Sequence, residues 1–600
     1  MSEKKIVNDL SIQVATVNGS GSQSANNIII KTLFRMGIPV GGKNIFPSNI
    51  AGLPTWFIIR ANKHSYTARK NDTDMMILMN QDTIDEDFSK VKTGGVVIYN
   101  SDLKVQESSF RDDIVSYAVP FSTLARENFA DIKLRKLLTN MLYVGFLSQL
   151  INLDEETVKV AISDNFKGKA KAVEANYNAY EIGAKYFKEN FAKQDNYYVE
   201  KMDATSGKIL IDGNSSAAIG SLFAGCTVVP WYPITPSSSL CETLIEYLKE
   251  YRIDENGKAK FSEIQAEDEL AAIGMVLGAS WAGARALTAT SGPGISLMSE
   301  FVGLAYYAEI PAVIWDVQRV GPSTGLPTRT NQGDVMTTYT LSHGDTKHIL
   351  LFPSSPEECF YMADTAFELA EKFQTPVFVL SDLDIGMNNW MSNEFNFPEN
   401  IYDRGKVLDA DALEKVGEFA RYKDVDGDAI PYRTLPGTKH KLASFFTRGT
   451  GHNEKAVYSE RSDDYVNNMD RLNRKFETAR KFVPAPVTDW VEGAKVGIIA
   501  FGSSDLAMTE ARDIMQKEGL KTNYLRLKAL PFSQEVIDFI DKNDVVYVLE
   551  QNRDAQLYKI FLMESADHKR NLRSLVHYSG LPLDALSISN GILSKERIMA

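Results

Sequence analysis

Two loops rich in proline and glycine carry side chains suited to hold a carboxylate. One is Tyr232-Pro233-Ile234-Thr235-Pro236-Ser237-Ser238, and the other runs from Gln318 to Thr328 and includes Arg319. The guanidinium of Arg319 offers a planar fork of N–H donors that matches a carboxylate. The hydroxyls of Thr235 and Thr328 can each add a donor, and the rigid neighbours limit the entropy that such a contact costs. A single threonine in a proline-rich loop is more often part of a turn or a helix cap.

An acidic run and a glycine turn lie between these loops. Glu267-Asp268-Glu269 precedes an apolar helical pattern, and Ser291-Gly292-Pro293-Gly294 follows a short strand pattern. Acids at a helix start stabilise the helix dipole, so a structural role for this run stays open. The glycines of the turn allow the backbone to approach a cofactor or a partner subunit, and they also suit a tight strand-to-helix turn.

The cysteines and histidines predict neither a cluster nor a metal site. The chain has three cysteines, Cys226, Cys241 and Cys359, and none forms a Cys-x-x-Cys pair. A four-iron cluster usually needs four thiolates. The seven histidines lack the His-x-x-x-His spacing of metal ligands. We therefore assign no metal ligand to this chain.

The elements that must position these residues predict an α/β, multidomain protein with four regions. Residues 1–200 alternate strand and helix patterns in a Rossmann-like order. Residues 206–395 contain the two loops among buried strand patterns such as PAVIWDV, and residues 396–490 are polar with short apolar runs. Residues 491–600 return to α/β, with KVGIIAFGSS, NYLRLKAL and DVVYVLEQN as strands.

The N-terminal region contains a glycine turn before a helix, Gly19-Ser20-Gly21-Ser22-Gln23. Such a turn exposes backbone N–H groups that can bind a phosphate. The dinucleotide-binding pattern is incomplete, because Ser24 takes the place of its third glycine. A structural turn or a contact to coenzyme A is favoured over nucleotide binding.

Length and charge narrow the class of protein further. The 600 residues predict three or four domains. The net charge of −13 disfavours nucleic acid and anionic membranes as partners. We find no apolar run of the roughly 18 residues that span a bilayer, and MSEKKIVNDL lacks the apolar core of a signal peptide. A cytoplasmic protein is expected.

With these motifs together, the chain resembles the 2-oxoacid:ferredoxin oxidoreductases. The loop 232–238 looks like the YPITPSS signature of that family, and QRVGPSTGLPT over 318–328 resembles its second signature. LPFSQEVIDFI and VVYVLEQNRDAQL look like its transketolase C-terminal-like domain. The N-terminal region resembles the gamma domain, here fused ahead of the alpha portion. The 206–395 region would then be the pyrimidine-type thiamine diphosphate domain.

The resemblance implies roles for the candidate residues. Thr235, Arg319 and Thr328 would bind the substrate carboxylate, and Tyr232, Pro233, Ile234 and Gly292 would contact thiamine diphosphate. Glu267 would hydrogen-bond the aminopyrimidine ring and so promote loss of the proton at C2 of the thiazolium, with Asp268 or Glu269 as nearby alternatives. Arg329 is a candidate for a distal carboxylate or a surface partner.

The resemblance also implies a partner. The diphosphate needs a metal-binding GDG…N segment, and Gly427-Asp428-Ala429 with Asn453 lies in a polar stretch instead of after an apolar strand. This DVDGD loop also lacks the remaining EF-hand pattern. Mg²⁺ and a 4Fe–4S cluster would then belong to a separate beta subunit in an (alpha–beta)₂ heterotetramer, with ferredoxin and coenzyme A as further partners.

The implied reaction is the oxidative decarboxylation of a 2-oxoacid with coenzyme A and ferredoxin. The fused order and QRVGPSTGLPT favour 2-oxoglutarate, which would give succinyl-CoA and CO₂; pyruvate and other 2-oxoacids stay open. A non-catalytic transketolase-like scaffold is the alternative class. The N-terminal region departs from the gamma pattern at 19–23 and at Leu53-Pro54-Thr55-Trp56-Phe57, so we assign it no catalytic residue.

Overall fold

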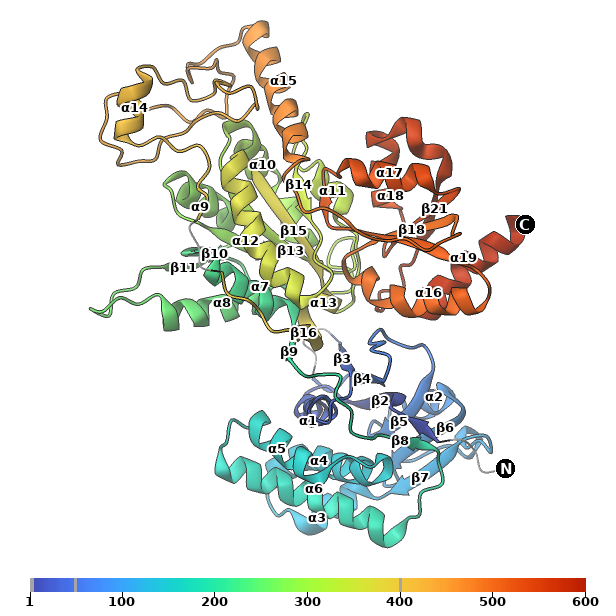
Figure 1. Ribbon diagram of the computed structural model, residues 1–600. Coiled ribbons are helices and arrows are strands. Elements are labelled where there is room, and N and C mark those ends of the chain that lie inside the picture. Colours follow the sequence, from blue (N-terminus) through green and yellow to red (C-terminus); the bar gives the residue numbers. More distant parts are fainter. Residues whose placement is uncertain (1–4, 48–50, 399–401, 600) are drawn as a thin grey trace.

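The computed structural model describes residues 5–47, 51–398 and 402–599. It contains three α/β units: the central and C-terminal units lie side by side, and the N-terminal unit lies below them in the view of Figure 1. A polar segment that includes α14 (Ala410–Val416) and α15 (Ser462–Ala479) extends from the central unit. The predicted α/β, multidomain fold is confirmed.

The N-terminal unit is built on a six-stranded sheet in the order β3-β4-β2-β5-β6-β7. Strands β2, β5, β6 and β7 run parallel, and β4 runs antiparallel to both of its neighbours. The strands are β2 (Asp9–Val17), β3 (Val40–Ile45), β4 (Pro54–Asn62), β5 (Thr73–Leu78), β6 (Val91–Asn100) and β7 (Val115–Val119). The helices are α1 (Ser22–Arg35), α2 (Ile84–Ser89), α3 (Phe121–Asn128), α4 (Ile132–Ile151), α5 (Glu155–Asn165) and α6 (Ala170–Asn190).

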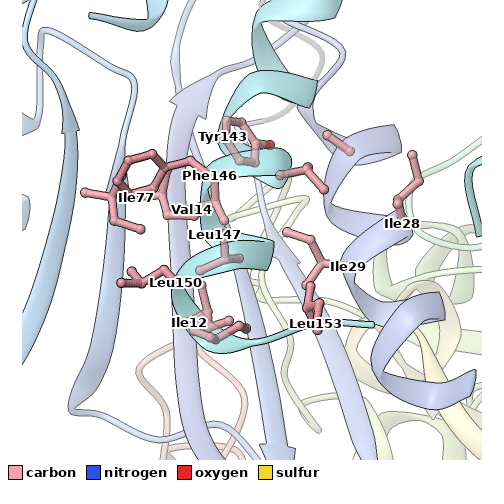
Figure 2. Packing of buried hydrophobic residues seen from close by; sticks show 14 of the residues in the cluster. Ile12, Val14, Ile28, Ile29, Ile77, Tyr143, Phe146, Leu147, Leu150 and Leu153 are labelled. Atoms are coloured by element: carbon pink, nitrogen blue, oxygen red, sulfur yellow. The ribbon is translucent and has the colours of Figure 1, made fainter. Parts of the chain in front are cut away.

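Helices α1 and α4 pack on this sheet through aliphatic and aromatic side chains, as Figure 2 shows for Ile12, Ile29 and Phe146. Helix α6 lies unusually close to α4. A Cβ on Gly145 would lie 2.0 Å from the Tyr180 carbonyl oxygen, and a Cβ on Gly183 would lie 2.0 Å from that of Leu142. Glycine is therefore required at both positions, because any side chain would force the helices apart.

The central unit has a mainly parallel sheet in the order β12-β13-β15-β14-β20. The pair β10-β11 continues it through a bridge between Val228 and Ala286. Strand β13 is buried at every position, as expected of a parallel strand covered on both faces. The strands are β10 (Val228–Trp231), β11 (Ser262–Gln265), β12 (Leu287–Thr290), β13 (Ala312–Gln318), β14 (Ile349–Leu351) and β15 (Pro376–Asp382). The helices are α7 (Gly213–Phe223), α8 (Ser238–Tyr251), α9 (Glu269–Trp281), α10 (Gly292–Ala308), α11 (Val335–Tyr339), α12 (Pro356–Phe373) and α13 (Leu383–Met387).

The C-terminal unit has a five-stranded sheet in the order β17-β19-β18-β21-β22. Its chain also supplies β20 (Ala529–Leu530) to the central sheet, where it pairs antiparallel with β14. The strands are β17 (Val487–Asp489), β18 (Val496–Phe501), β19 (Thr522–Leu527), β21 (Val545–Glu550) and β22 (Leu572–Val576). The helices are α16 (Met508–Lys517), α17 (Gln534–Lys542), α18 (Gln556–Glu564) and α19 (Ala585–Met599).

The N-terminal unit is joined to both others by buried polar contacts. The ammonium of Lys43 lies 2.6 Å from an Asp384 oxygen, and both side chains are buried. Gly42 and Asn389 exchange two backbone hydrogen bonds of 3.1 Å. Arg60 contacts Glu510 of the C-terminal unit at 3.1 Å. The N-terminal unit is therefore held against the central unit by β3 and against α16 by β4.

A buried ion network attaches α15 to the central unit. Glu309, at the end of α10, is fully buried and accepts two hydrogen bonds from Arg471, at 2.9 and 2.8 Å, and one of 2.6 Å from Lys475. Burial alone would raise the pKa of Glu309, but Arg471 and Lys475 outweigh it and lower that pKa to about 2. Burial also lowers the pKa of Lys475 to about 8 despite Glu309, since Arg471 and Arg421 lie nearby. Arg471 is thus the main counter-charge of Glu309.

Replacing Glu309 by glutamine is expected to destabilise the protein by about 3–5 kcal/mol, because two buried cations would lose their anion. Since the folded pKa lies below the ordinary value of 4.5, this stabilisation is present above that pH and is lost as the pH falls toward 2. Urea unfolding at neutral pH measures the effect. Asp463→Asn, which breaks an exposed pair with Arg461, is the control and should leave the midpoint unchanged; equal midpoints for both variants would contradict the network's role.

Candidate active site

The carboxyl ends of the parallel central strands bring the predicted site residues to one edge of the sheet. Strand β10 leads into the loop 232–238, β12 leads into the turn 291–294, and β13 ends beside Arg319. Strand β11 precedes the acidic run 267–269. Ligands of open α/β sheets bind at this edge. The topology thus unites segments that are far apart in the sequence.

Arg319 connects the two predicted loops directly. Its Nη1 donates a 2.7 Å hydrogen bond to the carbonyl oxygen of Thr235, and its side chain is largely buried. Its Nε has no hydrogen-bond partner among the described residues. Burial lowers the pKa of Arg319, and the nearby carboxylates of Asp334 and Glu269 offset part of that shift. The guanidinium therefore keeps donor capacity for a ligand.

The side chains of the loop 232–238, which Arg319 contacts, differ in their exposure to solvent. Tyr232, Ile234 and Thr235 are half-buried, and Pro233 is exposed. The carbonyl of Ile234 accepts backbone hydrogen bonds from Ser237 at 2.9 Å and from the next residue at 3.1 Å, which shapes the turn into α8. The hydroxyl of Thr235 is thereby carried on a loop whose backbone is held by both its own turn and Arg319.

The three acids at the start of α9 face different surroundings. Glu267 is exposed, and Asp268 caps the helix by accepting a 2.7 Å hydrogen bond from the N–H of Ala271. Glu269 is 5% exposed and lies in the electrostatic field of Arg319. Burial therefore separates the three acids: Glu269 faces inward, Asp268 caps the helix, and the predicted Glu267 lies at the surface.

Two glycines allow Glu269 and the start of α10 to meet. A Cβ on Gly294 would lie 1.9 Å from Thr290 Oγ1 and 2.7 Å from Glu269 Cγ. A Cβ on Gly292 would lie 2.9 Å from an Asp334 oxygen. The buried hydroxyl of Ser291 has no partner among the described residues. The start of α10 thus packs its backbone directly against two carboxyl side chains, Asp334 at Gly292 and Glu269 at Gly294.

Thr328 holds the second loop to the N-terminal unit. Its hydroxyl donates a 2.7 Å hydrogen bond to the carbonyl oxygen of Phe46, and Arg329 Nη1 donates to the same oxygen at 2.9 Å. Thr328 is buried, and Gly580 of the C-terminal unit packs on Arg329. The proton of the Thr328 hydroxyl is thus already engaged, so this side chain serves as a tether in the structure.

Buried carboxyls at this edge were not identified from the sequence. Asp316 on β13 and Asp334 before α11 lie next to each other, and the charge of Arg319 acts on Asp334. Asp382, at the end of β15, caps α13, and burial together with Asp384 raises its pKa to about 6. The only available signal was an aspartate inside the apolar strand pattern PAVIWDV.

The acidic loop near Gly427 has its own cation. Lys406 Nζ lies 2.6 Å from Asp426 and 2.8 Å from Asp428. Across the described ranges, no group of acids, cysteines and histidines has the arrangement of a metal site. Among the helices described, none is both long and apolar enough to cross a membrane.

Comparisons with known proteins agree with this architecture. Residues 219–399 match the family described as "Pyruvate flavodoxin/ferredoxin oxidoreductase, thiamine diP-bdg", and residues 11–186 match "Pyruvate ferredoxin/flavodoxin oxidoreductase". Subunit alpha of 2-oxoacid:ferredoxin oxidoreductase 2 from Aeropyrum pernix is 29% identical, over 97% of both chains. The 2-oxoglutarate synthase subunit KorA of Archaeoglobus fulgidus is 35% identical, over 57% of this chain and 88% of that one.

A solved structure resembles the whole chain. It is the 2-oxoglutarate:ferredoxin oxidoreductase from Magnetococcus marinus with 2-oxoglutarate, coenzyme A and succinyl-CoA bound, at a TM-score of 0.88 and 29% identity over 99% of this chain and 100% of that one. The central unit is thus a thiamine-diphosphate-binding domain of an oxidoreductase. The chain belongs to the 2-oxoacid:ferredoxin oxidoreductase family and corresponds to its alpha subunits.

Proposed function

We propose that the chain is the alpha subunit, with a fused gamma domain, of a 2-oxoglutarate:ferredoxin oxidoreductase. The assembled enzyme would convert 2-oxoglutarate, coenzyme A and oxidised ferredoxin into succinyl-CoA, CO₂ and reduced ferredoxin. The observation that carries this proposal is the convergence of Thr235, Glu269 and Arg319 at one edge of the central sheet. The names of the KorA relatives and of the Magnetococcus enzyme support 2-oxoglutarate as the substrate.

The residues present fit thiamine diphosphate. Glu269 would hold a proton toward the ring nitrogen of the aminopyrimidine, and the half-buried backbone at Gly292 would lie against that ring. When bound, the cofactor supplies the electron sink for decarboxylation. Arg319 would bind the substrate carboxylate through donors that Thr235 leaves free, and the Thr235 hydroxyl would add a further donor.

A beta subunit would complete this site. The acids at 426–428 are already paired with Lys406, so the diphosphate, Mg²⁺ and the 4Fe–4S cluster are assigned to the partner. Large apolar side chains stay exposed beside the site, namely Leu270 and Met275 on α9 and Leu297 on α10. Exposed apolar groups around a site are typical of a surface that another subunit covers. An (alpha–beta)₂ assembly in the cytoplasm follows from the same proposal.

Co-expression with the beta subunit tests the function. Viologen reduction would be followed with coenzyme A and 2-oxoglutarate, pyruvate or a branched-chain 2-oxoacid. We expect the highest kcat/KM with 2-oxoglutarate and no turnover by this chain alone. Lack of activity with every 2-oxoacid would refute the enzyme, and a preference for pyruvate would refute the substrate assignment.

Thr328→Val is expected to lower kcat/KM by about 5- to 12-fold, since the lost hydrogen bond to Phe46 is worth about 1–1.5 kcal/mol in holding the loop. Steady-state kinetics of the assembled enzyme measure the change. Thr340→Val, which removes an exposed hydroxyl at the end of α11, is the control. A loss confined to the KM for the 2-oxoacid would contradict the tether and indicate direct substrate contact.

A further inference from the structure

Asp316 is a buried acid that the proposed function does not use. It is 0% exposed, and neither of its carboxylate oxygens has a hydrogen-bond donor in the described part of the chain. Asp334 lies within hydrogen-bonding reach of it, and Asp334 Oδ2 is likewise buried without a donor. Two adjacent carboxylates in such a place cannot both be ionised, because each buried charge would lack compensation. The geometry therefore requires a proton between them.

The position of Asp334 is enforced by two units of the protein. Its backbone N–H donates to Gln318 Oε1 at 3.1 Å, and Gln318 Nε2 donates to the carbonyl of Ser381. From the C-terminal unit, Gln556 Nε2 donates to the Gly333 carbonyl at 2.6 Å and Gln556 Oε1 accepts from the N–H of Met336 at 2.9 Å. The backbone is thus held at Asp334 and at residues on either side of it in the sequence, and this keeps the carboxyls of Asp316 and Asp334 together.

Arg319 is a cation whose charge acts on Asp334, one member of this pair. Two carboxylates offset the effect of burial on the pKa of Arg319, and Asp334 has a larger effect than Glu269. Among the described residues at the start of α10, the backbone of Gly292 lies next to Asp334, and the neighbouring Ser291 hydroxyl is buried and neutral. The charge state of the pair therefore acts on Arg319 through Asp334.

We infer that Asp316 and Asp334 are positioning residues that share a proton and serve as the resident counter-charge of Arg319, so that binding of a substrate carboxylate at Arg319 is coupled to uptake of a second proton by the pair. This inference rests on the proposed role of Arg319. No covalent bond changes in this step. The proton comes from solvent and returns to it when the carboxylate leaves, and a second anion near Arg319 raises the proton affinity of the first one.

The sign of the pH dependence follows from the pair. Burial and the Asp334 carboxyl raise the pKa of Asp316, and burial raises the pKa of Asp334 to about 6. Below that pH both carboxyls are protonated, so the pair is neutral and does not compete with the substrate carboxylate for Arg319. Above that pH the pair holds one proton and one negative charge, and this charge competes with the substrate. The KM for 2-oxoglutarate should therefore rise with pH through about 6, by about tenfold if substrate and pair are coupled by about one pKa unit.

Infrared difference spectroscopy of the assembled enzyme tests for the shared proton and does not depend on a measurement of activity. The wild-type spectrum at neutral pH should contain a protonated-carboxyl C=O band that is absent from both Asp334→Asn and Asp316→Asn. Because Asp382 and Glu550 also have raised pKa values, the band is taken from the difference between wild type and variant. A spectrum in which both variants keep the full band would overturn the inference.

The pH profile of KM tests the coupling to substrate. Asp334→Asn places an N–H donor where the shared proton lies, so the variant should keep one negative charge, a KM near the wild-type value at neutral pH, and a flat profile. Asp364→Asn, on α12 and with a buried oxygen that has no donor in the described structure, is the matched control and should keep the wild-type profile. A wild-type profile in Asp334→Asn refutes the coupling alone, whereas inactivity of the wild-type enzyme with all 2-oxoacids refutes the proposed function.

Discussion

Replacing Glu269 by glutamine is expected to lower kcat of the assembled enzyme by about 10²- to 10⁴-fold, the usual contribution of a positioned proton-transfer group. Glu269 is 5% exposed, lies beside the start of α10 and shares the field of Arg319. The amide keeps the shape of the side chain but cannot exchange a proton with the pyrimidine nitrogen. Hydrogen–deuterium exchange at C2 of bound thiamine diphosphate, followed by NMR after quenching, measures this step directly.

Glu267→Gln is the matched comparison for that variant. Glu267 is exposed in the structure, so its replacement is expected to leave C2 exchange within about twofold of the wild-type rate, as for most surface substitutions. Thermal unfolding of both variants checks that the fold is intact. Slow exchange in Glu267→Gln with normal exchange in Glu269→Gln would restore the role to Glu267 and contradict the assignment to Glu269.

Replacing Arg319 by alanine is expected to lower kcat/KM for 2-oxoacids by roughly 30- to 5,000-fold, because truncating one partner of a buried charged hydrogen bond costs about 2–5 kcal/mol. The variant loses the fork for the carboxylate and also the 2.7 Å bond that holds the Thr235 carbonyl. Both losses weaken substrate binding, which precedes the chemical step, so KM should change more than kcat.

A comparison of two substrates distinguishes binding of the carboxylate next to the carbonyl from binding of a distal carboxylate. Every 2-oxoacid has the carboxylate next to its carbonyl, so Arg319→Ala should impair 2-oxoglutarate and pyruvate by similar factors. Arg329, whose Nη1 bonds to the Phe46 and Thr328 carbonyls, is the comparison. A loss in Arg329→Ala that is specific to 2-oxoglutarate would show a distal carboxylate contact. An unchanged KM in Arg319→Ala would contradict its assignment.

A lysine at the same position tests whether the planar shape of the guanidinium matters in addition to its charge. Arg319→Lys keeps a positive charge but offers a compact ammonium in place of a planar fork. We expect a kcat/KM between those of the wild type and the alanine variant. Recovery of the full wild-type value would show that charge alone is sufficient.

The strands and helices around the site could be predicted because their signals are local. The apolar pattern PAVIWDV indicates a buried parallel strand, and β13 is buried at every position. SANNIIIKTLFRMG likewise indicates the helix that the structure shows as α1. The antiparallel pairing of β4 with β2 and β3 was not predicted, since pairing partners depend on the topology of the whole sheet.

The sequence by itself determined the family and the two loops that carry Thr235 and Arg319, because their proline, glycine and arginine residues are contiguous. Only the tertiary structure decided which of the acids at 267–269 faces inward, since Glu267 and Asp268 precede α9 and their directions depend on how the chain enters the helix. It also placed the Thr328 hydroxyl on Phe46 and brought Asp316 next to Asp334. These partners are distant in sequence, and no local pattern encodes which distant groups the folded chain brings into contact.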